Sequence, residues 1–331
     1  MIKVVSFSGG RTSAKLCHRM IKKFGRKRVK FIYMDTGLEH PKTYEFIKNV
    51  NKTFELNLTC LQADFSKPLN SPTAYTVVDI ESLKTDFSIF RAMLAKYGVP
   101  YIGGMYCTSR LKTRPFKAYC KSIYGDDYET WLGIRADEPA RLIGGKNYIA
   151  AKKEIGCTPE MALDMYRDFK EHGVPGLSNH FVLSEKRERK VFDKIYKHLD
   201  QQRIDNKHHL ADISDDEKWD INRFWESQLF DLEINDWLGN CMFCPKKSDL
   251  KLVAASMDEE GYYNKYVEMV KSEHVRIDGI QGRESKMYRG KQSIDNLIGK
   301  FDGVTGEEIK QRIKGEHRTD TGSCSESCEL L

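Results

Sequence analysis

The chain has 331 residues, of which 40% are hydrophobic and 31% are charged, and its formal net charge at pH 7 is +6. This length allows one large α/β domain with additions, or two smaller domains. No apolar stretch reaches the roughly 18 residues of a membrane-spanning helix, so we expect no membrane partner.

Short apolar runs alternate with helical patterns along the first 140 residues. The predicted strands are 2–8, 29–35, 55–63 and 128–134. The predicted helices between the first three strands are 12–24 and 40–54, and another helical stretch follows Pro115. This β-α-β-α-β order is typical of a parallel sheet covered by helices, so we predict a doubly wound, mostly parallel α/β fold.

The composition changes beyond Arg141, which divides the chain into four predicted segments. Residues 1–141 form the α/β domain, and residues 142–211 are an insertion of uncertain role, without clear strands. Residues 212–250 complete the domain and contain an amphipathic helix predicted over 214–238. The last segment, 251–331, is a C-terminal extension that is polar and basic from about residue 270.

The turn after the first strand has the composition of a phosphate-binding loop. Its sequence, SGGRTS, covers residues 8–13. A glycine pair between a strand and a helix lets backbone N–H groups approach a ligand, and the helix N-terminus adds partial positive charge. The hydroxyls of Ser8 and Ser13 can donate hydrogen bonds, and Arg11 adds a full charge. A tight turn that only needs small residues is the alternative, and the Walker pattern is absent.

A second candidate segment, MDTGLEHPKTY, covers residues 34–44. Asp35 should lie at the carboxyl end of the second strand, which is the edge where open parallel sheets bind ligands. Thr36 and Gly37 follow it. Helix capping and turn formation are the alternative roles of these three residues.

Together these two segments resemble the PP-loop ATP pyrophosphatase superfamily, and within it the phosphoadenosine/adenosine phosphosulfate reductase family. CTSRLKTRPF (107–116) resembles the cysteine, basic and proline segment of the iron–sulfur members, and GIRADEPAR (133–141) resembles their G-x-R-x-x-E-x-x-R element. WDINRFW and the later GNCMFC are similar to the late helix and closing C-x-x-C of the family. The resemblance covers 2–141 and 212–250, and it implies an adenine nucleotide alpha hydrolase-like fold whose residues 1–141 bind a nucleotide.

The resemblance implies an adenine nucleotide, either ATP or an adenosine phosphosulfate, at the sheet edge. The implied nucleotide-binding residues are Ser8, Gly9, Gly10, Arg11, Thr12, Ser13, Asp35, Thr36, Gly37, Arg135 and Arg141. Both arginines would meet the anionic sulfate or phosphate end, since the guanidinium fork binds oxyanions bidentately; pairing with Asp137 and Glu138 is their alternative role. Thr12 stands where the family usually has aspartate, which weighs against the ATP pyrophosphatase reaction.

Nine cysteines indicate metal or redox chemistry, because the start of the chain, MIKVVSF, lacks a secretory signal and we expect a reducing, cytoplasmic location. Cys241 and Cys244 form a C-x-x-C that can ligate one metal centre, with Cys107 as a remote third ligand. Tyr106 replaces a second adjacent cysteine of the iron–sulfur reductases, so the resemblance implies a [4Fe–4S] cluster with one open iron.

Other ligands and another metal remain open. Zinc held by three cysteines and a histidine is the alternative to the cluster, because thiolate-rich sites suit both metals. Cys157 is a candidate fourth ligand. The three cysteines Cys17, Cys60 and Cys120 are expected in the core.

The last two cysteines, Cys324 and Cys328, lie in the tail GSCSESCELL. Sulfonucleotide reductases use a C-terminal cysteine as the nucleophile on the substrate sulfur. The resemblance implies that a tail thiol forms a thiosulfonate, which the neighbouring cysteine or a thioredoxin-like reductant resolves to release sulfite. Lys112 or Arg110 could lower a thiolate pKa or hold the leaving phosphate. Incidental thiols on a tail are the alternative.

The favoured function is therefore the thiol-dependent reduction of an adenosine phosphosulfate to sulfite. One alternative is an ATP-dependent iron–sulfur sulfurtransferase of the nucleic-acid thiolation or phosphorothioation type. The other is a nucleotide-binding protein without turnover. The basic runs 26–28 and 186–190 are short, so charge alone supports a nucleic-acid partner only weakly.

Overall fold

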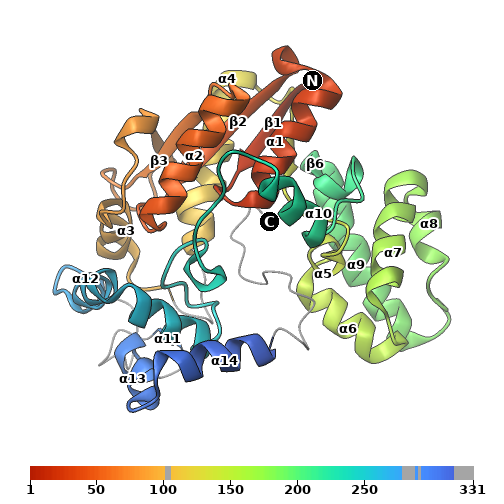
Figure 1. Cartoon of the computed structure of the whole chain (residues 1–331). Helices are drawn as coiled ribbons and strands as arrows, with labels where there is room; N and C mark the ends of the chain where they lie inside the picture. Colours follow the sequence, from red (N-terminus) through yellow and green to blue (C-terminus); the bar gives the residue numbers. More distant parts are fainter. Residues whose placement is uncertain (101–105, 278–287, 290–291, 317–331) are drawn as a thin grey trace. The chain divides into compact units, whose positions relative to one another are not determined.

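Six strands form one sheet, and the computed structural model describes residues 1–100, 106–277, 288–289 and 292–316. The strands are β1 (Ile2–Phe7), β2 (Val29–Asp35), β3 (Thr59–Asp64), β4 (Ala74–Val78), β5 (Tyr128–Leu132) and β6 (Lys207–His209). Their order in the sheet is β4-β3-β2-β1-β5-β6. Figure 1 labels β3, β2, β1 and β6 of this sheet. β1 pairs with β5, β2 with β3 and β5 with β6 in parallel, whereas β3 and β4 are antiparallel. The predicted mostly parallel α/β fold is therefore confirmed.

The strand order reverses at β1. From there the chain proceeds through β2 and β3 to one side of the sheet, and β5 and β6 lie on the other side. Open α/β sheets bind ligands beyond the carboxyl ends of the strands at such a reversal. This topology therefore indicates the turn after β1 as the position of a candidate functional site.

The chain divides into two compact units. The first comprises Met1–Val5, Arg11–Val29 and Asp127–Gln228, and the second comprises Ser6–Gly10, Lys30–Asp126 and Leu229–Leu331. The four predicted segments, 1–141, 142–211, 212–250 and 251–331, cut the chain differently and remain a prediction.

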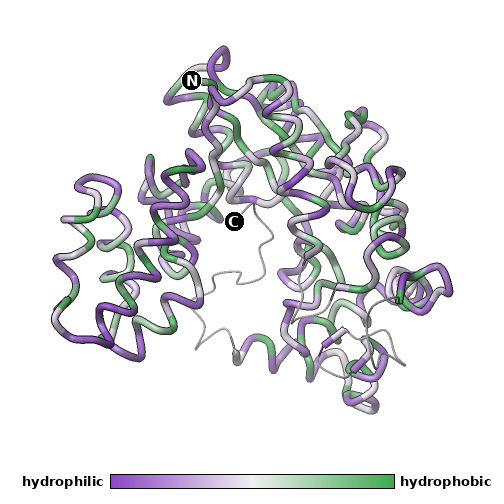
Figure 2. Tube along the Cα trace, turned by 180° about the vertical axis from the view of Figure 1, so that it is seen from behind, coloured by the Kyte–Doolittle hydropathy of each residue, from purple (hydrophilic) through white to green (hydrophobic). Residues whose placement is uncertain are grey.

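The first unit is rich in helices. They are α1 (Arg11–Phe24), α5 (Pro139–Leu142), α6 (Gly145–Ile155), α7 (Pro159–His172), α8 (Val174–Ser178), α9 (Lys186–Ile204), α10 (Lys218–Glu226), η1 (Arg26–Arg28) and η4 (Leu210–Asp212). Hydrophilic and hydrophobic turns alternate along α6 to α9 (Figure 2), and α9 buries one apolar face that includes Val191, Ile195 and Leu199. The predicted insertion is thus mainly helical. It also contains β6, which the sequence did not indicate because its three residues gain their partner only by pairing with β5.

Two predicted elements have different bounds in the structure. β3 begins at Thr59 rather than at residue 55, because Glu55 and Asn57 adopt left-handed backbone angles that end α2 and turn the chain. The amphipathic helix predicted over 214–238 is shorter in the structure, where it corresponds to α10. It ends at Glu226 because the side chains of Ser227 and Gln228 bond back to the carbonyl of Phe224.

The second unit buries its core between the sheet and the C-terminal helices. Its helical segments are α2 (Pro41–Phe54), η2 (Ile80–Ser82), α3 (Ser88–Tyr97), the π-helix η3 (Thr108–Thr113), α4 (Arg114–Tyr124), η5 (Asp236–Leu238), α11 (Asp249–Asp258), α12 (Glu260–Lys271), α13 (Ile294–Ile298), η6 (Gly299–Phe301) and α14 (Gly306–Glu316). Met93 of α3, Leu252 of α11 and Tyr266 of α12 share one apolar cluster with Met242 of the C-x-x-C segment. Among the described residues, no helix is long and apolar enough to cross a bilayer.

Candidate functional site

The turn after β1 needs glycine at position 9. Gly9 has a φ of +82°, and a Cβ there would lie 2.9 Å from Cδ1 of Ile47 and 3.2 Å from Cγ2 of Thr43. The missing side chain therefore brings this backbone against α2. α1 begins at Arg11 and has no acidic residue in its first turn, so its own side chains leave the partial positive charge of the helix N-terminus uncompensated. This is the local arrangement that favours a phosphate.

The loop after β2 is built around the buried carboxylate of Asp35. One carboxylate oxygen accepts hydrogen bonds from the N–H of Gly37 (3.0 Å) and the hydroxyl of Tyr44 (2.7 Å). The other accepts from Nε2 of Gln62 (2.8 Å). Asp35 thus holds the loop in shape, which is the turn-forming role named above, and its contact with a nucleotide remains a prediction.

Burial and the negative charge of Glu39 together raise the pKa of Asp35 to about 6, and its three hydrogen bonds only partly offset this rise. Glu39 is the residue of this loop that sequence reasoning missed. Its Oε2 accepts from Oγ1 of Thr36 (2.8 Å), and its Oε1 lies 3.7 Å from Nζ of Lys112. Both members of this ion pair are buried.

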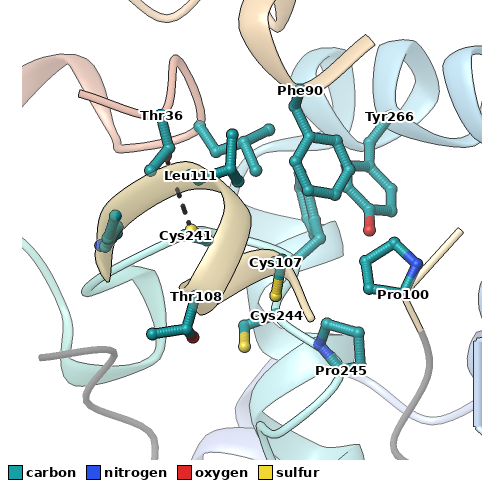
Figure 3. A pocket seen from close by; sticks show the side chains of 13 residues that line it. Thr36, Phe90, Pro100, Cys107, Thr108, Leu111, Cys241, Cys244, Pro245 and Tyr266 are labelled. Carbon is teal, nitrogen blue, oxygen red and sulfur yellow. Dashed lines mark hydrogen bonds between the residues drawn. The ribbon is translucent and has the colours of Figure 1, made fainter. Parts of the chain in front are cut away.

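Cys107, Cys241 and Cys244 line one cavity in the second unit, which is partly open to solvent (Figure 3). The structure thus brings the remote cysteine into the same cavity as the C-x-x-C pair, and the role of the three as metal ligands remains a prediction. The remaining lining residues are mainly apolar: Thr36, Leu38, Phe90, Pro100, Thr108, Leu111, Lys112, Phe243, Pro245 and Tyr266. We call this space the thiol cavity.

Backbone pairing ties the C-x-x-C segment to the loop after β2. The N–H of Met242 donates to the carbonyl of Leu38 (3.2 Å), and Glu39 and Cys241 form an isolated antiparallel bridge. Oγ1 of Thr36 lies 3.7 Å from Sγ of Cys241. Cys107 comes from the opposite wall, where it directly precedes η3. Single π-helical turns of this kind are frequent at functional sites.

The three cysteine sulfurs of the thiol cavity are donors of the type that binds zinc or an iron–sulfur cluster, and the bound group remains a prediction. Within the described residues, no three His, Cys, Asp or Glu side chains are placed to hold a metal ion. Two buried hydroxyl oxygens, those of Thr108 and Tyr266, have no hydrogen-bond partner among the described residues. Each unmade bond costs about 1–3 kcal/mol, which an acceptor in the cavity would offset.

Electrostatics within the cavity keep the hydroxyl of Tyr266 protonated. Burial raises the pKa of Tyr266 well above its usual value, and negative charge on Cys244, Cys107 and Cys241 raises it further. The hydroxyl is therefore a hydrogen-bond donor at neutral pH.

The two arginines of the G-x-R-x-x-E-x-x-R element lie in the first unit and are paired with its acids. Nε of Arg135 donates to Asp137 (2.7 Å), and Nη1 of Arg141 donates to Glu138 (2.6 Å). Nη1 of Arg135 also donates to Oγ1 of Thr12 (3.2 Å). Both arginines thus make the ion pairs named as their alternative role, and their contact with a nucleotide remains a prediction. Arg135 additionally joins this element to the first turn of α1.

The other predicted nucleotide contacts fall in both units. Ser8, Gly9, Gly10, Asp35, Thr36 and Gly37 belong to the second unit, and Arg11, Thr12 and Ser13 belong to the first. In the first unit, a Cβ on Gly133 would lie 3.0 Å from backbone atoms of Ser13. This close approach fixes the end of β5 against the start of α1.

The remaining cysteines have other surroundings. Cys17, Cys60 and Cys120 are buried, as expected, and burial raises the pKa of the Cys60 and Cys120 thiols to about 12. Such thiols are unreactive.

Cys157, the candidate fourth ligand, lies in the first unit, where its thiol donates a hydrogen bond to the carbonyl of Thr158. The predicted catalytic residues Cys324 and Cys328 lie outside the described residues.

Comparisons with known proteins agree with the predicted nucleotide-binding loop after β1 and with the mostly parallel sheet. A model of the phosphoadenosine phosphosulfate reductase domain matches residues 2–143. Over its full length the chain is 37% identical to the nin region protein ORF290 of Escherichia phage lambda, which is described as uncharacterized, and it covers 96% of that protein. The chain belongs to the phosphoadenosine phosphosulfate reductase domain family. This confirms the resemblance and places the chain in the PP-loop superfamily, among nucleotide-binding proteins of sulfur chemistry.

A more distant relative matches part of the chain. It is the uncharacterized protein MJ0066 of Methanocaldococcus jannaschii, which is 24% identical over 161 residues. That match covers 47% of this chain and 28% of the relative. No solved structure matches the chain. The family model itself ends before the C-x-x-C segment, so two of the three thiols lie outside the matched domain.

Proposed function

We propose that this family member binds an adenine nucleotide at the carboxyl ends of β1 and β2, and carries out sulfur chemistry beside it in the thiol cavity. The main observation in support of this proposal is the contact between Thr36 and Cys241. Thr36 belongs to the loop that follows Asp35, and its hydroxyl lies 3.7 Å from the Cys241 sulfur. A ligand bound against this loop would therefore lie next to the thiols.

The thiols would hold an inorganic centre. Cys107, Cys241 and Cys244 are the ligands in this proposal, and of the two groups that thiolates suit, zinc and a [4Fe–4S] cluster, we propose the cluster. Such a cluster supplies a redox centre with one iron open to a non-protein ligand. Leu38, Leu111 and the aromatic rings of the cavity surround the site with apolar surface, which limits access of water and strengthens the electrostatic interactions inside.

Lys112 is placed to serve an anion in this site. It lines the thiol cavity, and its ammonium lies 3.7 Å from Oε1 of the buried Glu39. This distance leaves the ammonium able to attract a thiolate or a sulfonate at the cavity as well. The predicted role of Lys112 in lowering a thiolate pKa or holding a leaving phosphate is compatible with this position.

The reaction we propose is the thiol-dependent reduction of an adenosine phosphosulfate to sulfite. A cysteine thiolate attacks the substrate sulfur, the bond from that sulfur to the phosphate oxygen breaks, and the adenosine phosphate leaves. A second thiol then attacks the cysteine sulfur of the thiosulfonate, so that sulfite leaves and a disulfide forms. A thioredoxin-like dithiol supplies the two electrons that restore the thiols. Cys328 as nucleophile and Cys324 as resolving thiol rest on the sequence alone.

An ATP-dependent sulfurtransferase is the second candidate, and the number of thiols favours it. Three cysteines line the cavity, and no fourth cysteine among the described residues joins them. An open iron could carry the sulfide that such an enzyme delivers to a nucleic acid or a small molecule. Thr12, at the position of the usual aspartate, weighs against this candidate.

Product analysis separates these functions. The full chain, purified without oxygen, is incubated with an adenosine phosphosulfate and a dithiol, or with ATP, sulfide and a mixture of transfer RNA and DNA as acceptor. Sulfite from the first mixture supports the reductase. AMP and pyrophosphate from the second mixture, without sulfite from the first, support the sulfurtransferase. Nucleotide binding with no product from either mixture would overturn both and leave a binding protein.

A further inference from the structure

Tyr266 brings a polar group into the thiol cavity from the C-terminal part of the chain. It lies on α12, which is outside the residues that the family model matches. Its side chain is 1% exposed and lines the cavity together with Cys107, Cys241 and Cys244 (Figure 3). Its hydroxyl oxygen has no hydrogen-bond partner among the described residues.

Aromatic packing fixes the position of the Tyr266 ring. The ring stacks on Phe90 at a centroid distance of 6.1 Å, and it contacts Phe243 at 5.3 Å and Tyr288 at 6.4 Å. A phenylalanine would make the same ring contacts. Packing therefore accounts for the ring at this position but leaves the hydroxyl without a structural role.

Most other polar side chains of the cavity already have partners. Oγ1 of Thr36 donates to Glu39, and Lys112 is paired with Glu39. Oγ1 of Thr108 is buried and, like the hydroxyl of Tyr266, has no partner among the described residues. Because buried hydroxyls are normally satisfied, two such donors beside three thiols point to an acceptor that the described residues do not supply.

We propose that the Tyr266 hydroxyl donates a hydrogen bond to a sulfur atom of the thiolate-bound centre and thereby raises its reduction potential, with Thr108 as a second donor. This inference rests on the inorganic centre of the proposed function. Hydrogen bonds to the sulfurs stabilise the additional negative charge of the reduced state, so they raise the potential. Tyr266 acts through the sulfur and is a positioning residue. The C-terminal extension would then set the redox property of a centre bound elsewhere in the chain.

The test compares Tyr266→Phe with Tyr263→Phe in the full chain, purified without oxygen. Tyr263 lies on the same helix and packs against Phe243 at 5.8 Å, but it is not among the residues that line the cavity. Iron and sulfide content, circular dichroism and the midpoint potential are measured for each protein. We expect Tyr266→Phe to keep its fold and its iron while its potential shifts to a lower value. Tyr263→Phe should match the wild type, and Thr108→Val should shift the potential in the same direction as Tyr266→Phe.

A second variant keeps the test decisive should Tyr266→Phe lose the centre. Replacing Tyr266 by 3-fluorotyrosine retains the hydroxyl and makes it a stronger donor, so the potential should rise. Unchanged potentials in a loaded wild type and its loaded variants overturn the hydrogen bond and leave the proposed function intact. A wild-type protein that holds no iron overturns both.

Discussion

The hydroxyl of Thr36 lies 3.7 Å from the sulfur of Cys241, 205 positions further along the chain. Thr36 directly follows the last residue of β2, and Cys241 opens the C-x-x-C segment. The contact joins the predicted nucleotide loop to the thiol cavity inside one unit. Substitutions in the thiol cavity should therefore alter the loop after β2, and substitutions in that loop should alter the thiol cavity.

Replacing Cys107 by serine should remove bound iron. The hydroxyl of serine is a poor ligand for a soft metal centre, and only two of the three cavity thiols would remain. Cys120→Ala is the matched control, because Cys120 is buried in α4 and does not line the cavity. Iron analysis of the three anaerobically purified proteins checks this. Equal iron in Cys107→Ser and wild type would exclude Cys107 as a ligand.

Gly9→Ala should destabilise the protein and weaken nucleotide binding. An alanine would have to adopt a φ of +82° and place its Cβ 2.9 Å from Cδ1 of Ile47. Backbone strain of this kind costs about 1–3 kcal/mol. Gly10→Ala is the stability control, because its Cβ would meet only Oγ of Ser8 at 3.9 Å. Denaturant unfolding and calorimetry with ATP measure the two effects, and equal unfolding midpoints for both variants would contradict this account of the turn.

The strands that lead into the site could be predicted from sequence because their signals are local. β2 occupies residues 29–35 as predicted, since a short apolar run between a helical pattern and a glycine marks it without help from distant residues. The positions of the loops after β1 and β2 could be predicted from the same local pattern. β4 escaped prediction because it is an antiparallel edge strand with an exposed Val77, so its apolar pattern is weak.

The parts of the site that sequence reasoning missed depend on contacts between distant residues. Glu39 reads as a charged residue before a helix, yet it is buried between Thr36 and Lys112. Tyr266 reads as one aromatic residue of an amphipathic helix, and only the folded chain places it beside Cys107 and Cys244. Neither position carries a signal in its own neighbourhood of the sequence.

The buried Asp35 should make stability depend on pH between about 4 and 6. Its pKa is about 6 in the folded protein and 3.8 in the unfolded chain, so the folded protein binds more protons in this range. The contribution of Asp35 is therefore fully present below pH 3.8 and is lost as the pH rises through 6. A shift of this size corresponds to about 3 kcal/mol.

Asp35→Asn isolates that contribution. The free energy of unfolding of the wild type minus that of the variant should fall as the pH rises from 4 to 6, and should be level above pH 7. Urea unfolding at each pH provides the measurement. A difference that stays constant or increases with pH would show that folding does not raise the pKa of Asp35.

Cys328→Ser should abolish sulfite release and leave the iron content unchanged. The reductase reaction needs a thiolate nucleophile, whereas the predicted metal ligands are other cysteines. Cys324→Ser should slow turnover less when a dithiol is supplied, because the external thiol can resolve the thiosulfonate. Sulfite assays with an adenosine phosphosulfate check both variants. Full sulfite release by Cys328→Ser would remove that residue from the mechanism.

The central claim is that Cys107, Cys241 and Cys244 hold an iron–sulfur centre beside the nucleotide loop. Iron, acid-labile sulfide and zinc analysis of the wild-type protein, purified without oxygen, tests it most directly. We predict iron and sulfide in equal amounts, with little zinc. Zinc alone, or no metal at all, would contradict the claim.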